Sequence, residues 1–205
     1  MRIVAGALRG RTLVAPKGHS TRPTADRARQ ALFDVLEHAP WSRGLDGHRV
    51  VDLFAGSGAL GLEALSRGAA CCLFVDDDPA AIQAITDNVE ALKLDGRARV
   101  RRANGVRIGA MGAADGPAFD LAFIDPPYRK GLAEPALRAL SAGGWLAAGA
   151  IAVVEGAAED QPPEIPGYLT QGVRSWGAAR VHFLRVVSAD EPPGIEATKG
   201  VRNWR

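Results

Sequence analysis

Two short stretches of the sequence combine residue types that could do chemistry. The first, DLFAGSGALGLEAL, begins at the end of an apolar run and holds Gly56, Gly58 and Gly61 at the spacing G-x-G-x-x-G. Glycine at such a turn lets a ligand lie against the backbone, and this spacing is typical of nicotinamide-dinucleotide sites. The second stretch, DPPY, spans residues 125–128 and ends another apolar run. Together they predict a cofactor site beside a polar, aromatic slot.

Two carboxylates near the glycines help to discriminate between cofactors. Asp76 ends the next apolar run twenty residues after Gly56, where a carboxylate suits the two hydroxyls of a ribose. Nicotinamide dinucleotides and S-adenosyl-L-methionine both carry such a ribose, so this residue leaves both cofactors open. Asp52, four residues before Gly56, would repel a pyrophosphate but attract a cationic methionyl ammonium or sulfonium group. The stretch therefore favours S-adenosyl-L-methionine.

The DPPY stretch has the composition of a binding site for an amine. Pro126 and Pro127 fix the backbone and remove two amide donors, which leaves backbone carbonyls, the Asp125 carboxylate and an aromatic ring. The lone pair of an exocyclic nucleobase amine is conjugated into its ring, and two acceptors that bind its hydrogens would free that pair for attack. Tyr128 offers a stacking face worth about 1–3 kcal/mol per base. These residues predict methyl transfer to such an amine from a donor held in line.

The elements that must position these residues alternate between strand and helix. Apolar runs predict strands at 49–54, 71–76, 98–102, 119–125 and 150–155, followed by two longer strands that pair as a hairpin at 168–177 and 179–187. Helical periodicity is found between the strands at 59–68, 79–94 and 131–142. This alternation is typical of a doubly wound parallel sheet, in which ligands bind beyond the carboxyl ends of the strands.

The first fifty residues differ from the rest of the chain in charge. They hold nine Lys or Arg and four Asp or Glu, an excess of five, whereas the whole chain has a net charge of +2. A basic front on a near-neutral body suits a protein that binds a polyanion, although most basic stretches are simply solvated. Short strands at 2–5 and 11–14 are predicted here, followed by a helix over 22–39 with Thr24 as its N-cap.

Composition argues against several classes of protein. The 205 residues suit one domain and contain no uninterrupted apolar run of the roughly 18 residues that a membrane span needs. The basic, glycine-broken start is unlike a signal peptide, so a cytoplasmic location is predicted. Cys71 and Cys72 are adjacent and are expected to be small apolar residues of a strand rather than a disulfide. The four histidines lack the spacing of metal ligands, so no metal is expected.

Four motifs in this order resemble a known family. RIVAGALRGRTL, RPTADRARQALF, DLFAGSGALGLEALSRGA and IDPPY are together similar to the RsmD family of bacterial guanine-N(2) methyltransferases, which act on 16S ribosomal RNA, and the likeness runs from Arg2 to Val187. The resemblance implies an α/β, Rossmann-like class I methyltransferase fold. Such a fold has a seven-stranded, mostly parallel sheet with an antiparallel last strand, here with a small N-terminal β-hairpin and helix. The implied donor is S-adenosyl-L-methionine, and the implied acceptor is a guanine of the small ribosomal subunit, of the guanine(966)-N(2) type.

The same resemblance assigns roles to individual residues. The cofactor would be held by Asp52, Phe54, Ala55, Gly56, Ser57, Gly58, Asp76, Asp77, Asn104 and Gly105, with Thr24 and Arg27 closing over it or meeting RNA. The catalytic residues would be Asp125, Pro126, Pro127 and Tyr128, and the contacts to RNA phosphates would be Arg9, Arg11, Lys17 and Arg22. Gln30 departs from the family pattern, which has Glu there, so a charged role is not carried over to it. The expected organisation is an N-terminal extension (1–44), a methyltransferase domain (45–188) and an extended tail (189–205).

Three alternatives stay open from the sequence. The same chemistry could methylate an adenine or cytosine amine in DNA, although so short a chain shows no separate target-recognition segment. A nicotinamide-dependent oxidoreductase would share the glycine spacing, and a catalytically silent RNA-binding protein would share the fold. The expected partner is 16S rRNA in the small ribosomal subunit or in an assembly intermediate, and the chain is expected to be a monomer without membrane contact.

Overall fold

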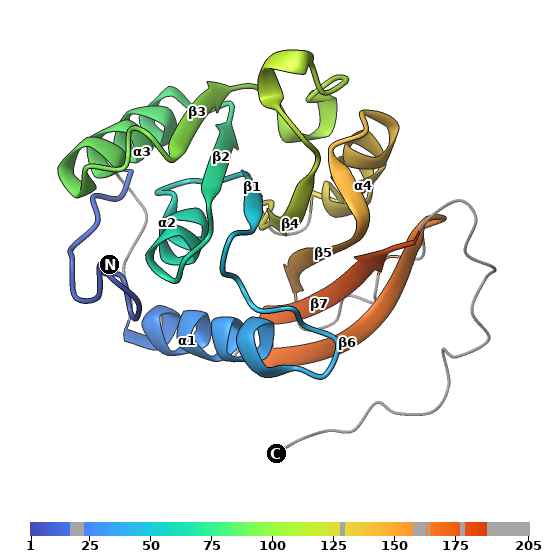
Figure 1. Ribbon diagram of the computed structural model, residues 1–205, viewed down its shortest axis with the longest axis horizontal. Coiled ribbons are helices and arrows are strands. Elements are labelled where there is room, and N and C mark those ends of the chain that lie inside the picture. Colours follow the sequence, from blue (N-terminus) through green and yellow to red (C-terminus); the bar gives the residue numbers. More distant parts are fainter. Residues whose placement is uncertain (17–22, 128–129, 158–162, 164, 177–178, 188–205) are drawn as a thin grey trace.

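A seven-stranded sheet forms the centre of the protein (Figure 1). The computed structural model describes residues 1–16, 23–127, 130–157, 163, 165–176 and 179–187, and of residues 23–25 the backbone alone. The strands are β1 (Arg49–Leu53), β2 (Cys71–Asp76), β3 (Ala98–Arg102), β4 (Phe119–Ile124), β5 (Leu146–Ala157), β6 (Tyr168–Trp176) and β7 (Ala179–Val186). The helices are α1 (Pro23–His38), α2 (Ala59–Ser66), α3 (Pro79–Leu92) and α4 (Ala133–Ala142), with two short 3-10 helices, η1 (Gly105–Arg107) and η2 (Ala113–Asp115).

The strand order is β3-β2-β1-β4-β5-β7-β6, which confirms the class I methyltransferase fold that the motifs implied. Strands β1 to β5 are parallel, whereas β7 lies between β5 and β6 and runs antiparallel to both. The predicted hairpin of the last two strands is confirmed as well. Because the chain moves outward from β1 to β3 and then returns to β4, the switch in strand order lies between β1 and β4. Ligands of open α/β sheets bind at such a switch point.

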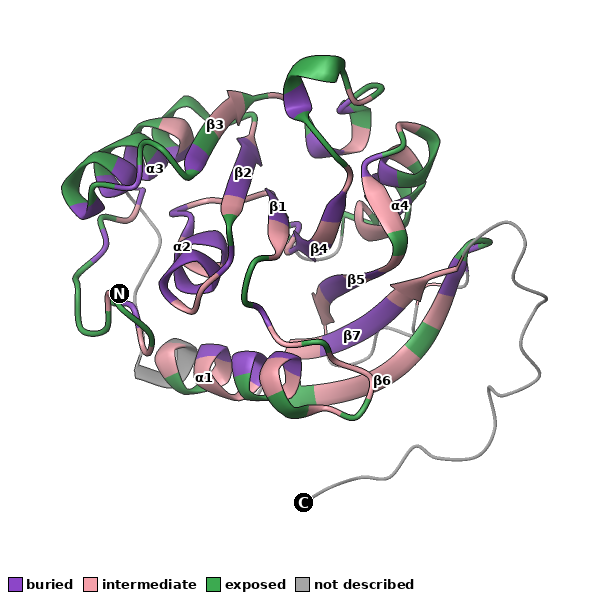
Figure 2. Ribbon diagram, viewed as in Figure 1, coloured by how far each residue is buried: buried purple, intermediate pink, exposed green. Residues whose placement is uncertain are grey.

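Helices cover both faces of the sheet, which explains why its strands are apolar runs rather than alternating patterns. On one face α1, α2 and α3 pack against the strands, and the rings of Phe33 and Phe123 lie 5.6 Å apart. On the other face α4 packs in a second cluster that contains the fully buried Trp145. Figure 2 shows that buried residues gather in the central strands and along the inner sides of the helices. Cys71 and Cys72 are free thiols of β2, as expected.

The N-terminal residues pair with each other but do not form the two regular strands that were predicted. An isolated antiparallel bridge joins Arg2 to Thr12. The ladder does not extend along the segment, because the amides of Val4 and Ala5 donate to the side chain of Glu63 in α2. The hairpin is therefore held by a helix as much as by its own backbone pairing.

Helix α1 begins at Pro23, so the prediction of Thr24 as its N-cap is wrong. Proline is favoured at the first helical position because the N–H that it lacks would have no partner there. The predicted tail, residues 189–205, lies outside the described residues. No helix in the described part of the chain has the length and apolar character needed to cross a membrane. Nor do the described side chains include a group of three or more His, Cys, Asp or Glu that could hold a metal ion.

Candidate active site

The loop after β1 places the glycines of the motif at the switch point, where they have different structural roles. Gly56 and Gly58 have φ angles of 57° and 76°, which glycine adopts without strain. A Cβ at Gly56 would meet, among the described residues, a single atom within 4 Å, the Phe54 carbonyl oxygen at 3.9 Å, so a ligand can approach the backbone there. A Cβ at Gly61 would instead lie 2.5 Å from the Cys72 sulfur and nearer still to the ring of Phe74. Gly61 therefore serves the close packing of α2 on β2.

Asp52 lies behind this loop, near the end of β1. It is 2% exposed, and its Oδ2 accepts a hydrogen bond from the Gly61 amide (2.9 Å) in the first turn of α2. Burial raises the pKa of Asp52 to about 8; the Gly61 hydrogen bond opposes this rise and the charge of Asp76 adds to it. The side chain thus stabilises the start of the helix. Its attraction to a cationic cofactor stays a prediction.

The Asp76 carboxylate joins the loops that follow β1 and β2. Its Oδ2 accepts from the Gly56 amide (2.9 Å) and its Oδ1 accepts from the Asp78 amide (3.0 Å). Asn104, which follows β3, donates from Nδ2 to Asp77 Oδ2 (2.9 Å), and both of these side chains are exposed. The structure therefore brings together polar side chains from the ends of neighbouring strands. Carboxylates and an amide in this arrangement suit the hydroxyl and amine groups of a nucleoside.

Phe54 and Gly105, two residues assigned to the cofactor site, depend on each other. Phe54 has a φ of 58°, a left-handed conformation that costs a non-glycine residue roughly 1–3 kcal/mol. Its ring lies against the backbone of Gly105, where a Cβ would come within 2.9 Å of Phe54 Cζ. Backbone strain of this kind gathers at functional sites, so its place beside the glycine loop agrees with a binding role.

Asp125 follows β4, the strand that lies beside β1. The pairing of Ile124 with Val154 places Asp125 next to Glu155 of β5. Burial raises the pKa of Asp125 well above its usual range, and the negative charges of Glu155 and Asp52 raise it further. The negative charge of the neighbouring Glu155 thus favours the protonated form of Asp125.

Glu155 was not among the predicted site residues. Its signal was an acidic residue at the end of the apolar run 150–155, in the position that Asp76 and Asp125 occupy at the ends of two other runs. The rest of the predicted catalytic motif is described in part. Pro126 is buried and Pro127 is exposed, whereas Tyr128 lies outside the described residues.

The residues predicted to contact RNA differ in their surroundings. Arg9 is exposed, and Arg27 is exposed on α1. Arg11 is also exposed, but its Nη2 donates to the Ala91 carbonyl in the last turn of α3 (2.9 Å), where a cation suits the helix dipole. Outside the described residues lie Lys17, Arg22 and the side chain of Thr24.

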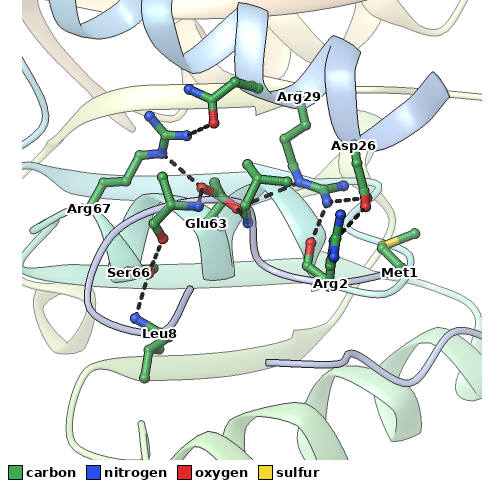
Figure 3. Close-up of polar contacts among 12 residues, drawn as sticks. Met1, Arg2, Leu8, Asp26, Arg29, Glu63, Ser66 and Arg67 are labelled. Atoms are coloured by element: carbon green, nitrogen blue, oxygen red, sulfur yellow. Dashed lines mark hydrogen bonds and ion pairs between the residues drawn. The ribbon is translucent and has the colours of Figure 1, made fainter. Parts of the chain in front are cut away.

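A buried ion cluster fastens the N-terminal segment to α2, the helix that starts at the glycine loop (Figure 3). Glu63 is fully buried, and its carboxylate accepts from the amides of Val4 (2.8 Å) and Ala5 (2.9 Å). The same carboxylate forms ion pairs with Arg67 (2.8 Å) and Arg29 (3.7 Å). The members of the cluster come from three separate segments, so no local pattern in the sequence indicates it.

The cluster also explains the glutamine at position 30. Gln30 Oε1 accepts from Arg67 (3.1 Å), while its Nε2 donates to Asp34 (2.5 Å). An amide can do both, because it carries an acceptor and a donor. A glutamate would keep the bond to Arg67 but would face Asp34 with a like charge, which is unfavourable at this helical spacing.

Comparisons with known proteins agree with this arrangement. A family model described as "Conserved hypothetical protein 95" matches residues 1–185. Ribosomal RNA small subunit methyltransferase D of Escherichia coli K12 is 41% identical over 166 residues, which cover 81% of this chain and 79% of that protein. The protein of the same name from Haemophilus influenzae is 36% identical over 157 residues, which cover 76% of this chain and 78% of that one.

A solved structure shows the same likeness in three dimensions. The Escherichia coli protein yhhF superposes with a TM-score of 0.76 at 35% identity, over 92% of this chain and 98% of that chain. The residues that the family model matches, 1–185, include both the glycine loop and the end of β4. The chain therefore belongs to the Conserved hypothetical protein 95 family, the RsmD family of methyltransferases.

Proposed function

We propose that this protein transfers a methyl group from S-adenosyl-L-methionine to the exocyclic N(2) amine of a guanine in 16S rRNA, of the guanine(966) type. The observation that carries the proposal is the juxtaposition of two strand ends. The glycine loop follows β1, and the segment Asp125-Pro126-Pro127 follows β4, its direct neighbour at the switch point. The choice of RNA rests on the names of the Escherichia coli and Haemophilus influenzae relatives.

The residues at the glycine loop fit S-adenosyl-L-methionine, which when bound supplies a methyl group on a cationic sulfonium. Gly56 leaves open space against the backbone, where a side chain would otherwise keep a ligand away. Asp76 and Asn104 offer acceptors and a donor of the kind that ribose hydroxyls and an adenine need. Asp52 and Asp125 lie close enough to interact with each other, and a nearby cation favours the ionised form of both.

Asp125 is proposed to bind the target amine and to accept its proton. The carboxylate and the Pro126 carbonyl would accept the two amine hydrogens, which leaves the nitrogen lone pair available. Transfer would break the bond between sulfur and the methyl carbon, leave S-adenosylhomocysteine and make the amine nitrogen cationic. That nitrogen would then lose one proton, for which a carboxylate with a raised pKa is the better base. Glu155 can stabilise the protonated form of its neighbour. Tyr128 is assigned the stacking face for the base.

The N-terminal region, residues 1–44, is proposed to contact the RNA backbone. Arg9 and Arg27 are exposed, and Lys17 and Arg22 are assigned the same role from the sequence. Each phosphate contact of this kind releases counterions, so the affinity for RNA would fall steeply as salt rises. A cytoplasmic monomer that acts on the small subunit, or on an intermediate in its assembly, completes the proposal.

Methyl transfer with radiolabelled cofactor tests this proposal. Asp125→Asn keeps the size of the side chain but removes the base, and it is expected to lower turnover at least about a hundredfold. Its affinity for S-adenosylhomocysteine, measured by calorimetry, is expected to change little. Glu134→Gln, which alters an exposed carboxylate of α4, is the matched control and should retain full turnover.

The choice of substrate separates the alternatives. Small ribosomal subunits, naked 16S rRNA and duplex DNA are each supplied, and nucleoside analysis identifies the methylated base. Full turnover by Asp125→Asn would overturn the assignment of the base. Methylation of DNA alone would identify a DNA amino-methyltransferase, and binding of NAD in place of S-adenosylhomocysteine would identify an oxidoreductase. Binding of RNA without any transfer would indicate a catalytically silent protein.

A further inference from the structure

Asn88 joins three segments that are far apart in the sequence. It lies in α3 and is 2% exposed. Its Nδ2 donates to the Ser57 carbonyl (3.0 Å) in the glycine loop and to the Val14 carbonyl (2.9 Å) in the N-terminal segment. Its Oδ1 accepts from the Val14 amide (2.8 Å). A buried amide with both donors and its acceptor engaged is held in one orientation.

The bond to Ser57 fixes a peptide unit on which the loop depends. The Ser57 carbonyl and the Gly58 amide belong to one planar group. The Gly58 amide donates to the Ala55 carbonyl (2.7 Å), so the unit is held at one end by the loop and at the other end by Asn88. Gly58 has a φ of 76° and directly precedes α2. Because both ends of the unit are bonded, the loop keeps the conformation that leaves the backbone of Gly56 accessible.

The N-terminal segment, residues 1–16, reaches the same loop residue from both of its ends. The Asn88 side chain bonds to Val14 and to the Ser57 carbonyl at the same time. At the other end of the segment, Met1 Sδ lies 3.3 Å from Ser57 Oγ. Between these points Ser66 of α2 accepts from the Leu8 amide (2.9 Å), a bond that does not involve the loop. The segment is therefore docked on α2 independently of Asn88, and it is connected to the glycine loop at two points, through Asn88 and through the contact of Met1 with Ser57.

We propose that Asn88 is a positioning residue for the cofactor, which holds the Ser57 carbonyl and so couples the glycine loop to the N-terminal segment. The inference rests on the proposed function, because it takes the glycine loop to be the cofactor site. Two consequences follow from the linkage of the two segments. Loss of the amide weakens cofactor binding, and cofactor binding in turn stabilises the bond between Val14 and Asn88.

Calorimetry with S-adenosylhomocysteine measures the first consequence. Asn88→Ala is expected to raise the Kd about tenfold, because it removes hydrogen bonds that preorganise the loop. The KM for the methyl donor should rise in parallel, with a smaller change in kcat at saturating donor. Gln83→Ala removes an exposed amide from the same helix, whose bond within the described residues goes to Asp87 one turn away, and it should leave the Kd unchanged. Ser66→Ala loosens the N-terminal segment without touching the loop, and it should change the Kd far less than Asn88→Ala does.

Hydrogen exchange in the wild-type protein measures the second consequence and needs no variant to fold. Addition of S-adenosylhomocysteine is expected to slow exchange of the Val14 amide as well as the Gly58 amide. The inference is overturned if folded Asn88→Ala binds with wild-type affinity, if Ser66→Ala causes the same loss, or if exchange at Val14 does not respond. Failure of the wild-type protein to bind S-adenosylhomocysteine at all would contradict the proposed function instead.

Discussion

Replacement of Glu63 by alanine is expected to lower the free energy of unfolding by about 5 kcal/mol, a large part of the 5–15 kcal/mol that is typical of a folded domain. The Glu63 side chain is 0% exposed, and its partners Arg67 and Arg29 are 3% and 6% exposed. Removal of one member of a buried pair costs about 3–5 kcal/mol, because the other charge stays buried. The amides of Val4 and Ala5 also lose their acceptor, at about 1–3 kcal/mol each where water cannot replace it.

Other partners limit the total loss. Arg29 keeps its ion pair with Asp26 (2.8 Å), and Arg67 keeps its pair with Glu37 (3.1 Å), which is why the expected loss lies at the lower end of the summed costs. Glu63→Gln removes the charge and keeps one of the two oxygens, so it can accept from the amide of Val4 or from that of Ala5 but not from both. Its loss should therefore be smaller than that of the alanine variant, and the difference between the two variants measures the remaining bond together with the packing of the side chain.

Urea unfolding measures both variants. With a slope of about 1–3 kcal/mol per molar urea, a loss of 5 kcal/mol moves the midpoint by roughly 2 M or more. Glu134→Ala is the matched control, because it breaks an exposed pair with Arg138 whose side chains are 52% and 55% exposed. Such a pair contributes less than about 1 kcal/mol. If Glu63→Ala were no more destabilising than this control, the buried cluster would not hold the N-terminal segment and the reasoning would be refuted.

Two further predictions concern the start of α2. Asp52→Asn should weaken the dependence of the free energy of unfolding on pH. The pKa of Asp52 is raised to about 8 in the folded protein, so between about pH 4 and 8 the folded state binds a proton that the unfolded state does not. In the wild-type protein the free energy of unfolding therefore falls as pH rises through this range. Urea unfolding across that range measures the slope, and an unchanged slope would count against a buried, neutral Asp52. Gly61→Ala should cost about 1–3 kcal/mol, because its Cβ would overlap Cys72 and Phe74. Gly96→Ala, whose Cβ would have no neighbour within 4 Å among the described residues, should not show this loss, and equal melting temperatures of the two variants would contradict the packing argument.

The order of the elements and the position of the candidate site at the strand ends could be predicted from the sequence, because both depend on local patterns. Runs of apolar residues of strand length, separated by helical periodicity, are sufficient to indicate a parallel sheet. The carboxyl ends of parallel strands meet at one edge, so acids such as Asp76 and Asp125 that end such runs were expected to converge. The start of α1 was predicted less well, since Thr24 is a good N-cap but Pro23 is equally suited to the first turn.

Only the tertiary structure decided which side chains meet. Glu63 bonds to Val4, which is 59 residues away in the sequence, and Asn88 bonds to Val14, which is 74 residues away. No periodicity in the sequence relates the members of either pair. These contacts exist because α2 and α3 pack on the same face of the sheet and present buried polar groups to the N-terminal segment.

The glycines of one motif show the same division. The sequence placed Gly56 and Gly61 in a single pattern, but one faces open space and the other faces buried side chains of β2. Likewise, Glu155 became a neighbour of Asp125 through the register between β4 and β5. Residue types and spacing determined which chemistry the chain carries. The packing of helices on the sheet and the register of its strands decided which groups are buried and paired, because these depend on contacts between segments that the local sequence does not encode.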